Sequence, residues 1–247
     1  MRIALLTDVH ANLEALLACL EHADRAGASR CVFLGDLVGY GADPAAVLDI
    51  VAGLVARGGA AVMGNHDQAT LQGPSPRMNA DARAVIGWTR SRLSPDALAF
   101  LAGLPLSLEE SGRLYVHANA WAPEQWDYIT SPFDAGRSMR ATLCRTTFCG
   151  HMHRPALYHM GPDGRTAAFT PTPNAGIPLG PPRRWLAIPG SVGQSRDGNP
   201  AACYALLDDA TDVLAFHRVP YDVDASVTKI RKAGLPLSFN ARFEAVP

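Results

Sequence analysis

Short apolar runs, each followed by polar residues, are the main pattern in the first third of this chain. The apolar residues in these runs are continuous rather than alternating, which predicts strands buried on both faces. Between them, the leucines from Leu13 to Leu20 recur with helical period, and Asp43-Pro44 is a typical helix start. We therefore expect strands at 2–7, 31–34 and 60–63, and helices over 13–27 and 43–57. This order predicts parallel strands with right-handed crossovers, as in α/β folds.

The middle of the chain has a different character. A helical insertion is predicted over about 72–103, with Asn79 capping one helix to about 92 and Ser94-Pro95 starting another that ends at Gly103. Residues 160–184 are rich in proline and glycine, which favours a hairpin with a long irregular excursion.

The remaining apolar runs predict a second sheet. Two of its strands are expected at 104–109 and 113–117, and a third at 146–149; strands at 185–188, 201–207 and 213–219 should complete it. Asp222 is predicted to cap a last helix to about 233, followed from Ser238 by a short helical tail. Because no repeat or linker divides the chain, residues 1–247 are expected to form a single domain.

Polar residues of the kinds that bind metals follow five of the predicted strands. Parallel strands place their carboxyl ends at one sheet edge, where ligands of α/β proteins gather. Each Asp-x-His or His-x-His pair is expected to point both side chains the same way, by the period of two of a strand. The candidate ligands are Asp8, His10, Asp36, Asn65, His117, His151 and His153.

Each of these residues alone has an ordinary structural explanation, such as a turn carboxylate or a core histidine. Together they do not, because Asp8 and Asp36 placed side by side would repel each other without a cation. The set contains oxygen and imidazole ligands and no thiolate, which favours Mn, Fe or Zn. Seven candidates are too many for one tetrahedral ion and suit two ions that share a carboxylate. His22, His159 and His217 lie in helix or strand patterns and are not included.

These residues carry a resemblance to a known family. The blocks Asp8-x-His10, Gly35-Asp36, Gly64-Asn65-His66-Asp67, His117 and Gly150-His151-x-His153 resemble those of the calcineurin-like metallophosphoesterase superfamily, in the family's order. The chain is similar to the compact bacterial and archaeal phosphodiesterases of that superfamily, in which Pro189-Gly190-Ser191-Val192-Gly193 also has a counterpart. The resemblance covers residues 1 to about 195 and implies a four-layer αββα sandwich of two mixed β-sheets.

The resemblance also assigns the ligands. It implies that Asp8, His10 and His153 hold one divalent metal ion and that Asp36 bridges to the other. The second ion would be held by Asn65, His117 and His151. Ala11 and Ala118 stand where the family often has glycine, and alanine is small enough to leave ligation intact.

Two such ions clamp a phosphate and activate a shared water, so a metal-bridging hydroxide is expected to attack phosphorus. The leaving oxygen then needs a proton. Because Asn65 fills the ligand position, His66 is free to act as the acid, and Asp67 is expected to orient its ring and raise its pKa.

Substrate contacts are expected from Asn12, which matches a family asparagine, and from Tyr40 and Arg196. The turn at 190–193 either presents backbone N–H groups to a phosphate or is a simple strand turn. Trp121, Trp126 and Tyr128 either stack a base or pack in the core.

Composition narrows the class of partner. A net charge of −1 gives no overall positive field that would attract nucleic acid or an anionic membrane. Five cysteines without a CxxC spacing favour a reduced, cytoplasmic protein. The N-terminal apolar run is too short for a signal peptide, and the run at 97–108 is too short to span a bilayer. No feature of the sequence indicates an oligomeric state.

The expected function is hydrolysis of phosphodiesters or small phosphorylated compounds. The alternative within the same chemistry is a phosphomonoesterase, acting on phosphoproteins or nucleotides. The alternative of another class is a non-catalytic scaffold that keeps the fold. The glycines of 35–41 lack the Gly-Lys-Ser/Thr of a nucleotide-binding P-loop, and Ser191 is not in a nucleophile elbow.

Overall fold

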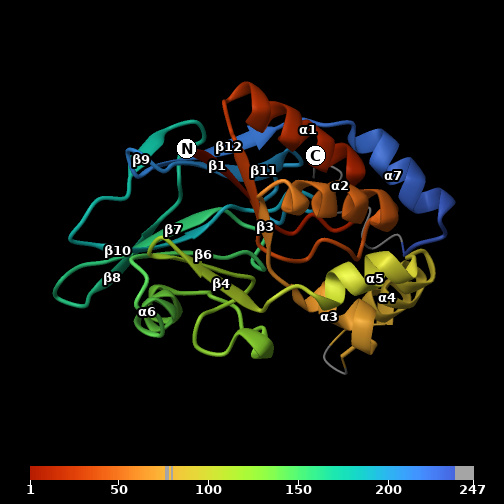
Figure 1. Cartoon of the computed structure of the whole chain (residues 1–247), viewed down its shortest axis with the longest axis horizontal. Helices are drawn as coiled ribbons and strands as arrows, with labels where there is room; N and C mark the ends of the chain where they lie inside the picture. Colours follow the sequence, from red (N-terminus) through yellow and green to blue (C-terminus); the bar gives the residue numbers. More distant parts are fainter. Residues whose placement is uncertain (76–77, 79, 237–247) are drawn as a thin grey trace.

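Two six-stranded mixed sheets organise the chain (Figure 1). The computed structural model describes residues 1–75, 78 and 80–236. In the first sheet the order is β3 (Ala60–Ala61), β2 (Arg30–Phe33), β1 (Arg2–Leu6), β11 (Ala202–Asp208), β12 (Val213–Val219) and β9 (Gly176–Pro178). In the second it is β4 (Ser107–Glu110), β5 (Arg113–Val116), β6 (Thr146–Phe148), β10 (Arg184–Ile188), β7 (Ala156–Met160) and β8 (Thr166–Phe169).

Seven helices of the described residues flank these sheets. Figure 1 shows α1, α2 and α7 along the outer side of the first sheet and α6 on the opposite side of the molecule, beside the second. These four helices are α1 (Leu13–Arg25), α2 (Pro44–Ala56), α6 (Pro132–Arg140) and α7 (Val223–Lys232). The other three are α3 (Asn65–Gln72), α4 (Ala80–Ser91) and α5 (Pro95–Ala102), and a short 3₁₀ helix, η1, spans Pro123–Gln125. The α/β sandwich expected from the resemblance is confirmed.

Strand β1 shows how the layers form. Ala4 and Leu6 pack into the core beneath the helices, whereas Ile3 and Leu5 pack between the two sheets. All four are at most 1% exposed, so the strand is buried on both faces as its continuous apolar run predicts. The core between the sheets also takes Tyr115 and Phe148 from the second sheet, which are stacked with ring centroids 5.8 Å apart.

The register places the strand ends together. Strands β1, β2 and β3 are parallel, with Leu6 opposite Phe33 and Phe33 opposite Ala61. In the second sheet β5 and β6 are parallel, with Tyr115 opposite Phe148. The segments that follow these five strands therefore begin at corresponding edges of the two facing sheets. The parallel strands predicted at 2–7, 31–34 and 60–63 are confirmed.

One assignment of strands to sheets was wrong. The strands predicted near 201–207 and 213–219 exist, but they belong to the first sheet, where β11 pairs antiparallel with β1 through Leu5 and Ala205. Of the three late strands only β10 joins the second sheet. Apolar alternation marks a strand but not its neighbour, because pairing depends on contacts distant in sequence.

The structure differs from the sequence prediction at the hairpin of β7 and β8, at β9 and at α3. The hairpin of β7 and β8 begins before residue 160, and the chain then crosses to the other sheet as β9. Helix α3 begins at Asn65, within the block Gly64-Asn65-His66-Asp67, for which a metal ligand and catalytic residues but no helix were predicted. Its start could have been recognised from Asp67, which occupies the third helical position and accepts from Gly64 N at 2.9 Å, half of a capping box. The predicted cap Asn79 and the tail from Ser238 lie outside the described residues.

Helix α2 starts where Asp43-Pro44 predicts, but the Asp43 side chain does not cap it. Its carboxylate instead accepts from Lys229 Nζ at 2.8 Å, and Lys229 also pairs with Glu14. This ties α7 to α1 and to the start of α2. Asp222 and Ser94 do cap their helices, through Ala225 N and Ala97 N. Within the described residues, no helix is both long and apolar enough to cross a bilayer.

Candidate metal centre

Six of the seven candidate ligands lie in loops that follow the strands, and the seventh, Asn65, is the first residue of α3; none lies in a strand. Strand β1 ends at Leu6 and β2 at Phe33, and Asp8 and Asp36 both have φ near 53°. His10, His151 and His153 also have positive φ, between 50° and 69°. Such values are uncommon outside glycine and concentrate at functional sites. The period-two argument for the Asp-x-His pairs was therefore wrong: left-handed turns, not an extended strand, bring the side chains together.

Backbone hydrogen bonds hold these strained loops in place. Asp8 N donates to Gly35 O at 3.1 Å and His10 N donates to Asp36 O at 2.9 Å. On the second sheet, Gly150 N donates to His117 O at 2.8 Å. Pairing thus continues beyond the strands, and it compensates for the unfavourable φ values.

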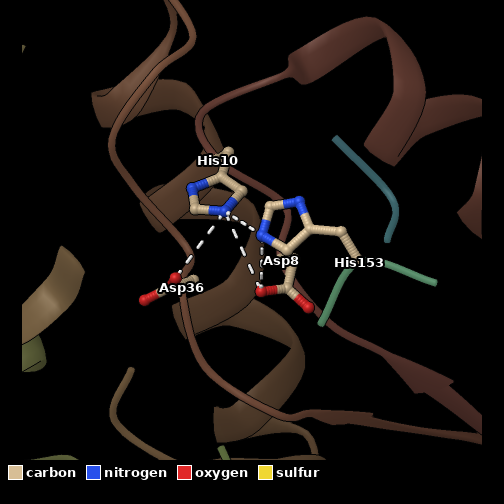
Figure 2. A group of neighbouring side chains, drawn as sticks. All are labelled: Asp8, His10, Asp36 and His153. Atoms are coloured by element: carbon tan, nitrogen blue, oxygen red, sulfur yellow. Dashed lines mark hydrogen bonds and ion pairs between the residues drawn. The ribbon is translucent and has the colours of Figure 1, made fainter. Parts of the chain in front are cut away.

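Four side chains form the first ligand group, Asp8, His10, Asp36 and His153, which Figure 2 shows converging on one point. One ligand atom of each lies within 4.8 Å of the others. His153 Nε2 is 3.2 Å from Asp8 Oδ1, and His10 Nε2 is 3.6 Å from Asp36 Oδ2. All four are at most 2% exposed.

The second group is Asp36, His117 and His151, again within 4.8 Å of one another. His117 Nε2 lies 3.3 Å from Asp36 Oδ2 and 3.2 Å from His151 Nδ1. Asn65 Oδ1 lies 3.2 Å from the same His117 nitrogen. Asp36 is the member common to both groups, and all seven predicted ligands are brought together.

The histidines are oriented to offer lone pairs to this centre. Nδ1 of His10, His117 and His153 lies 3.2, 2.7 and 2.6 Å from the backbone carbonyls of Val38, Leu34 and Gln194 respectively. Each Nδ1 must carry the proton to donate there, so in the neutral ring each Nε2 points inward as an acceptor. His10 and His153 then face each other lone pair to lone pair at 3.1 Å, an unfavourable contact that a cation relieves. The donor set fits a divalent metal.

The protonation states agree with that fit. Burial alone would raise the pKa of Asp36, but His117 and His66 hold it well below its usual value. The pKa of Asp8 is likewise lowered, against burial, by His153. Burial lowers the pKa of His151 to about 3. Burial would also lower the pKa of His117, but the adjacent Asp36 raises it to about 9. At neutral pH this ring therefore also carries a proton on Nε2, which must leave when a metal binds there.

Two comparisons identify the family. Residues 1–212 match the calcineurin-like phosphoesterase superfamily domain. The chain belongs to this family. It is 33% identical over 244 residues to an uncharacterized protein of Methanocaldococcus jannaschii, covering 95% of this chain and 93% of that one.

Solved structures place this calcineurin-like phosphoesterase among bacterial and archaeal proteins. A metallophosphoesterase from Sphaerobacter thermophilus is 34% identical, with a TM-score of 0.88, and the match covers 99% of this chain and 98% of that one. A hypothetical protein from Pyrococcus horikoshii shares the fold at 19% identity, with a TM-score of 0.79 and the same coverage.

The Asp67 carboxylate does not hydrogen-bond the His66 ring Nδ1, contrary to the expectation that it orients this ring. Its Oδ1 accepts from Leu37 N at 2.9 Å and Val38 N at 3.2 Å, and its Oδ2 accepts from Gly64 N. Burial lowers the pKa of His66 rather than Asp67 raising it. Asp67 therefore joins the loop after β2 to the start of α3, because a carboxylate offers enough lone pairs for three backbone donors.

Replacing Asp67 with alanine should destabilise the fold, because three buried N–H groups lose their acceptor. We expect a loss of about 3 kcal/mol, which lowers Tm by roughly 6–12 °C. The stability of Asp67→Asn, which keeps two acceptor positions, should lie between those of the wild type and Asp67→Ala. Thermal unfolding of all three proteins measures this. Unchanged stability with a lowered kcat would instead restore the orienting role first assigned to Asp67.

Ala11 lies at one of the positions where the family often has glycine, and the structure shows why. Its φ is 53° and it is fully buried. Ala11→Gly relieves the left-handed strain, which should stabilise the folded state by about 1–2 kcal/mol. Loss of a buried methyl costs about 0.8 kcal/mol and greater unfolded-chain freedom about 0.4–1 kcal/mol.

Ala11→Gly should therefore change the free energy of unfolding by less than about 1 kcal/mol. The buried helical Ala23 is the control, and Ala23→Gly should cost about 1.5–2 kcal/mol. Urea unfolding measures both variants. Equal losses would show that the Ala11 backbone is not strained.

The predicted substrate contacts have different surroundings. Asn12 caps α1, since its Oδ1 accepts from Ala15 N, and its Nδ2 donates to Gly193 O and to Tyr221 Oη. Its amide is thus engaged in hydrogen bonds inside the protein, and the predicted contact of Asn12 with substrate stays a prediction. Tyr40 lies beside His66, with ring centroids 4.4 Å apart. Arg196 donates from Nε and Nη2 to Gln194 Oε1.

A cavity of about 760 Å³ adjoins the centre. Tyr40, Asn65, His66 and His151 line it on the side of the ligands. Of the three aromatic residues between 121 and 128, Trp126 and Tyr128 border this cavity, whereas Trp121 packs against a hydrophobic cluster and beneath Arg137. His22, His159 and His217 lie in neither ligand group.

Proposed function

We propose that this chain hydrolyses phosphodiesters or small phosphorylated compounds with two divalent ions, Mn, Fe or Zn. The observation that carries the proposal is Asp36, which belongs to both ligand groups while each group also has imidazoles of its own. An arrangement of this kind suits two ions that share one carboxylate. When bound, such ions clamp a phosphate and activate a water molecule.

His66 is the residue proposed to protonate the leaving oxygen. It belongs to neither ligand group, lines the cavity, and is 5% exposed. Its Nδ1 is buried and has no hydrogen-bond partner among the described residues. The ring is held between Tyr40 and His10, at 4.4 and 4.9 Å between centroids. Contacts with neighbouring rings thus take over the orienting role first given to Asp67.

The charge of the cavity favours diesters over monoesters. Among the described residues that line it, none is lysine or arginine, whereas Glu124 and Asp127 are acidic. A diester brings one negative charge and a monoester close to two, so these carboxylates, away from the metal ions, repel the monoester more. Tyr40, which lines the cavity, remains a proposed substrate contact. So does Arg196, which lies outside that lining but whose charge acts on His66. The small substrate is favoured by the net charge of −1.

The test compares bis(4-nitrophenyl) phosphate with 4-nitrophenyl phosphate, each with Mn²⁺. We expect hydrolysis of both with a higher kcat/KM for the diester, and about two ions per chain by metal analysis. A reversed preference would support the phosphomonoesterase alternative. Hydrolysis of neither ester with metal bound would favour a scaffold.

A further inference from the structure

Tyr128 is placed unusually for a large aromatic residue. It is 47% exposed, yet its ring stacks on His151 with centroids 4.0 Å apart and an interplanar angle of 14°. One face therefore covers a candidate metal ligand, and the remainder of the ring borders the cavity. Burying this ring further against a ligand would remove apolar surface from water.

Trp126 forms the adjoining part of the same wall. Its ring packs edge-on against His117, 5.8 Å between centroids, and its Nε1 donates to Gln68 Oε1 at 3.1 Å. Its φ of 58° is left-handed, which a bulky side chain adopts only where the surroundings impose it. The strain indicates that the direction of this ring is constrained.

The loop that carries both rings is fixed from within. Asn119 is fully buried two residues after His117, and its Nδ2 donates to Asp127 O at 3.0 Å. Its Oδ1 accepts from Ala122 N at 2.9 Å. The aromatic wall is therefore held relative to the metal centre, which reduces the entropy lost when a ligand binds.

Helix α3 supplies hydrogen-bonding groups to the same cavity. Gln68 and Gln72 are four residues apart, so they share a helix face, and both line the cavity. Since Oε1 of Gln68 accepts from Trp126, its amide N–H₂ is the end that can donate to a ligand. Glutamine amides of this kind pair with the edges of nucleobases.

We propose that Trp126, Tyr128, Gln68 and Gln72 form a base-binding subsite, and that the substrate is a nucleoside phosphodiester. The phosphate would lie at the centre with the nucleobase against the aromatic wall. A cavity of about 760 Å³ is within the range of small-molecule sites. The substrate class rests on the proposed phosphoesterase function, whereas recognition of the base does not.

The test is a binding comparison between two probes that differ only in the base. These are the phosphonate analogues of AMP and of ribose 5-phosphate, in which CH₂ replaces the ester oxygen so that neither is hydrolysed. Calorimetric titration of the Mn²⁺-loaded chain gives Kd for each. Base stacking predicts that the adenosine probe binds about 5- to 150-fold more tightly.

The ratio of the two Kd values reports the contribution of the base alone, because a variant's effect on the metal centre changes both Kd values. Tyr128→Ala and Trp126→Leu should bring this ratio toward one, and Tyr128→Phe should preserve it. The control is Phe133→Ala, which removes a 74% exposed aromatic residue that does not line the cavity and should leave the ratio unchanged.

Equal Kd values in the wild type, or a ratio that survives both Tyr128→Ala and Trp126→Leu, would overturn the subsite. Hydrolysis of bis(4-nitrophenyl) phosphate is measured alongside. Hydrolysis with equal Kd values refutes the subsite alone. A high ratio without hydrolysis refutes the phosphoesterase function but supports recognition of the base.

Discussion

Asp36→Ala is expected to abolish metal binding at both positions of the centre. Asp36 is the residue shared by the two ligand groups, and its removal leaves each with fewer anionic oxygens among crowded imidazoles. Metal content should fall from about two ions per chain to well below one, and kcat/KM by at least about 10³-fold, because the water activation and charge stabilisation are lost together. Metal analysis and steady-state kinetics with the generic diester measure the two effects.

Two further variants sharpen this prediction. Asp36→Asn keeps the volume and the Oδ1 acceptor for His66 N, at 2.8 Å, but loses the charge, so it should also bind fewer ions. Asp24→Ala removes an exposed aspartate of α1 and should bind two ions with full activity. Full occupancy in Asp36→Ala would refute the shared position of this carboxylate.

His66→Ala should lower kcat by roughly 10²–10⁴ while metal content is unchanged. The side chain belongs to neither ligand group. The backbone N–H of residue 66, which donates to Asp36 Oδ1, remains in the variant and continues to orient that carboxylate. The loss should therefore appear in kcat, since the proton reaches the leaving oxygen only in the transition state.

The matched control for His66→Ala is His22→Ala, which removes a histidine that bonds Tyr204 Oη and belongs to neither ligand group. It should keep wild-type kcat. A second comparison uses esters with better leaving groups, which need less protonation, so the effect of His66→Ala should shrink with them. Loss of metal from His66→Ala, or an equal effect with every leaving group, would contradict the role as acid.

The order of strands and ligands in this chain is readable from the sequence because it depends on local chemistry. Continuous apolar runs mark buried strands, and the polar residues directly after them can lie only at the strand ends. Asp8, Asp36 and Asn65 follow three such strands, which are parallel neighbours. The seven candidate ligands were thus chosen from the sequence, and the structure brings them together.

Other features escaped the sequence for identifiable reasons. Asp67 is three residues from Gly64 and adjacent to His66, yet its carboxylate binds backbone donors of the loop after β2. The backbone N–H groups of Leu37 and Val38 come within reach of Asp67 only when the strands align. Likewise, β11 pairs with β1, some 200 residues earlier, because both present complementary edges and not because of any local signal.

The aromatic residues show the same division. Trp121 and Tyr128 are both aromatic residues of the same short segment, but one packs against a hydrophobic cluster and the other is 47% exposed beside His151. Local sequence encodes which residues are chemically suited to bind metal or stack, since this is a property of each side chain. Tertiary structure decides which of them meet: left-handed turns at Asp8, Asp36 and His151 direct the ligands to one centre, and packing between distant segments imposes those turns.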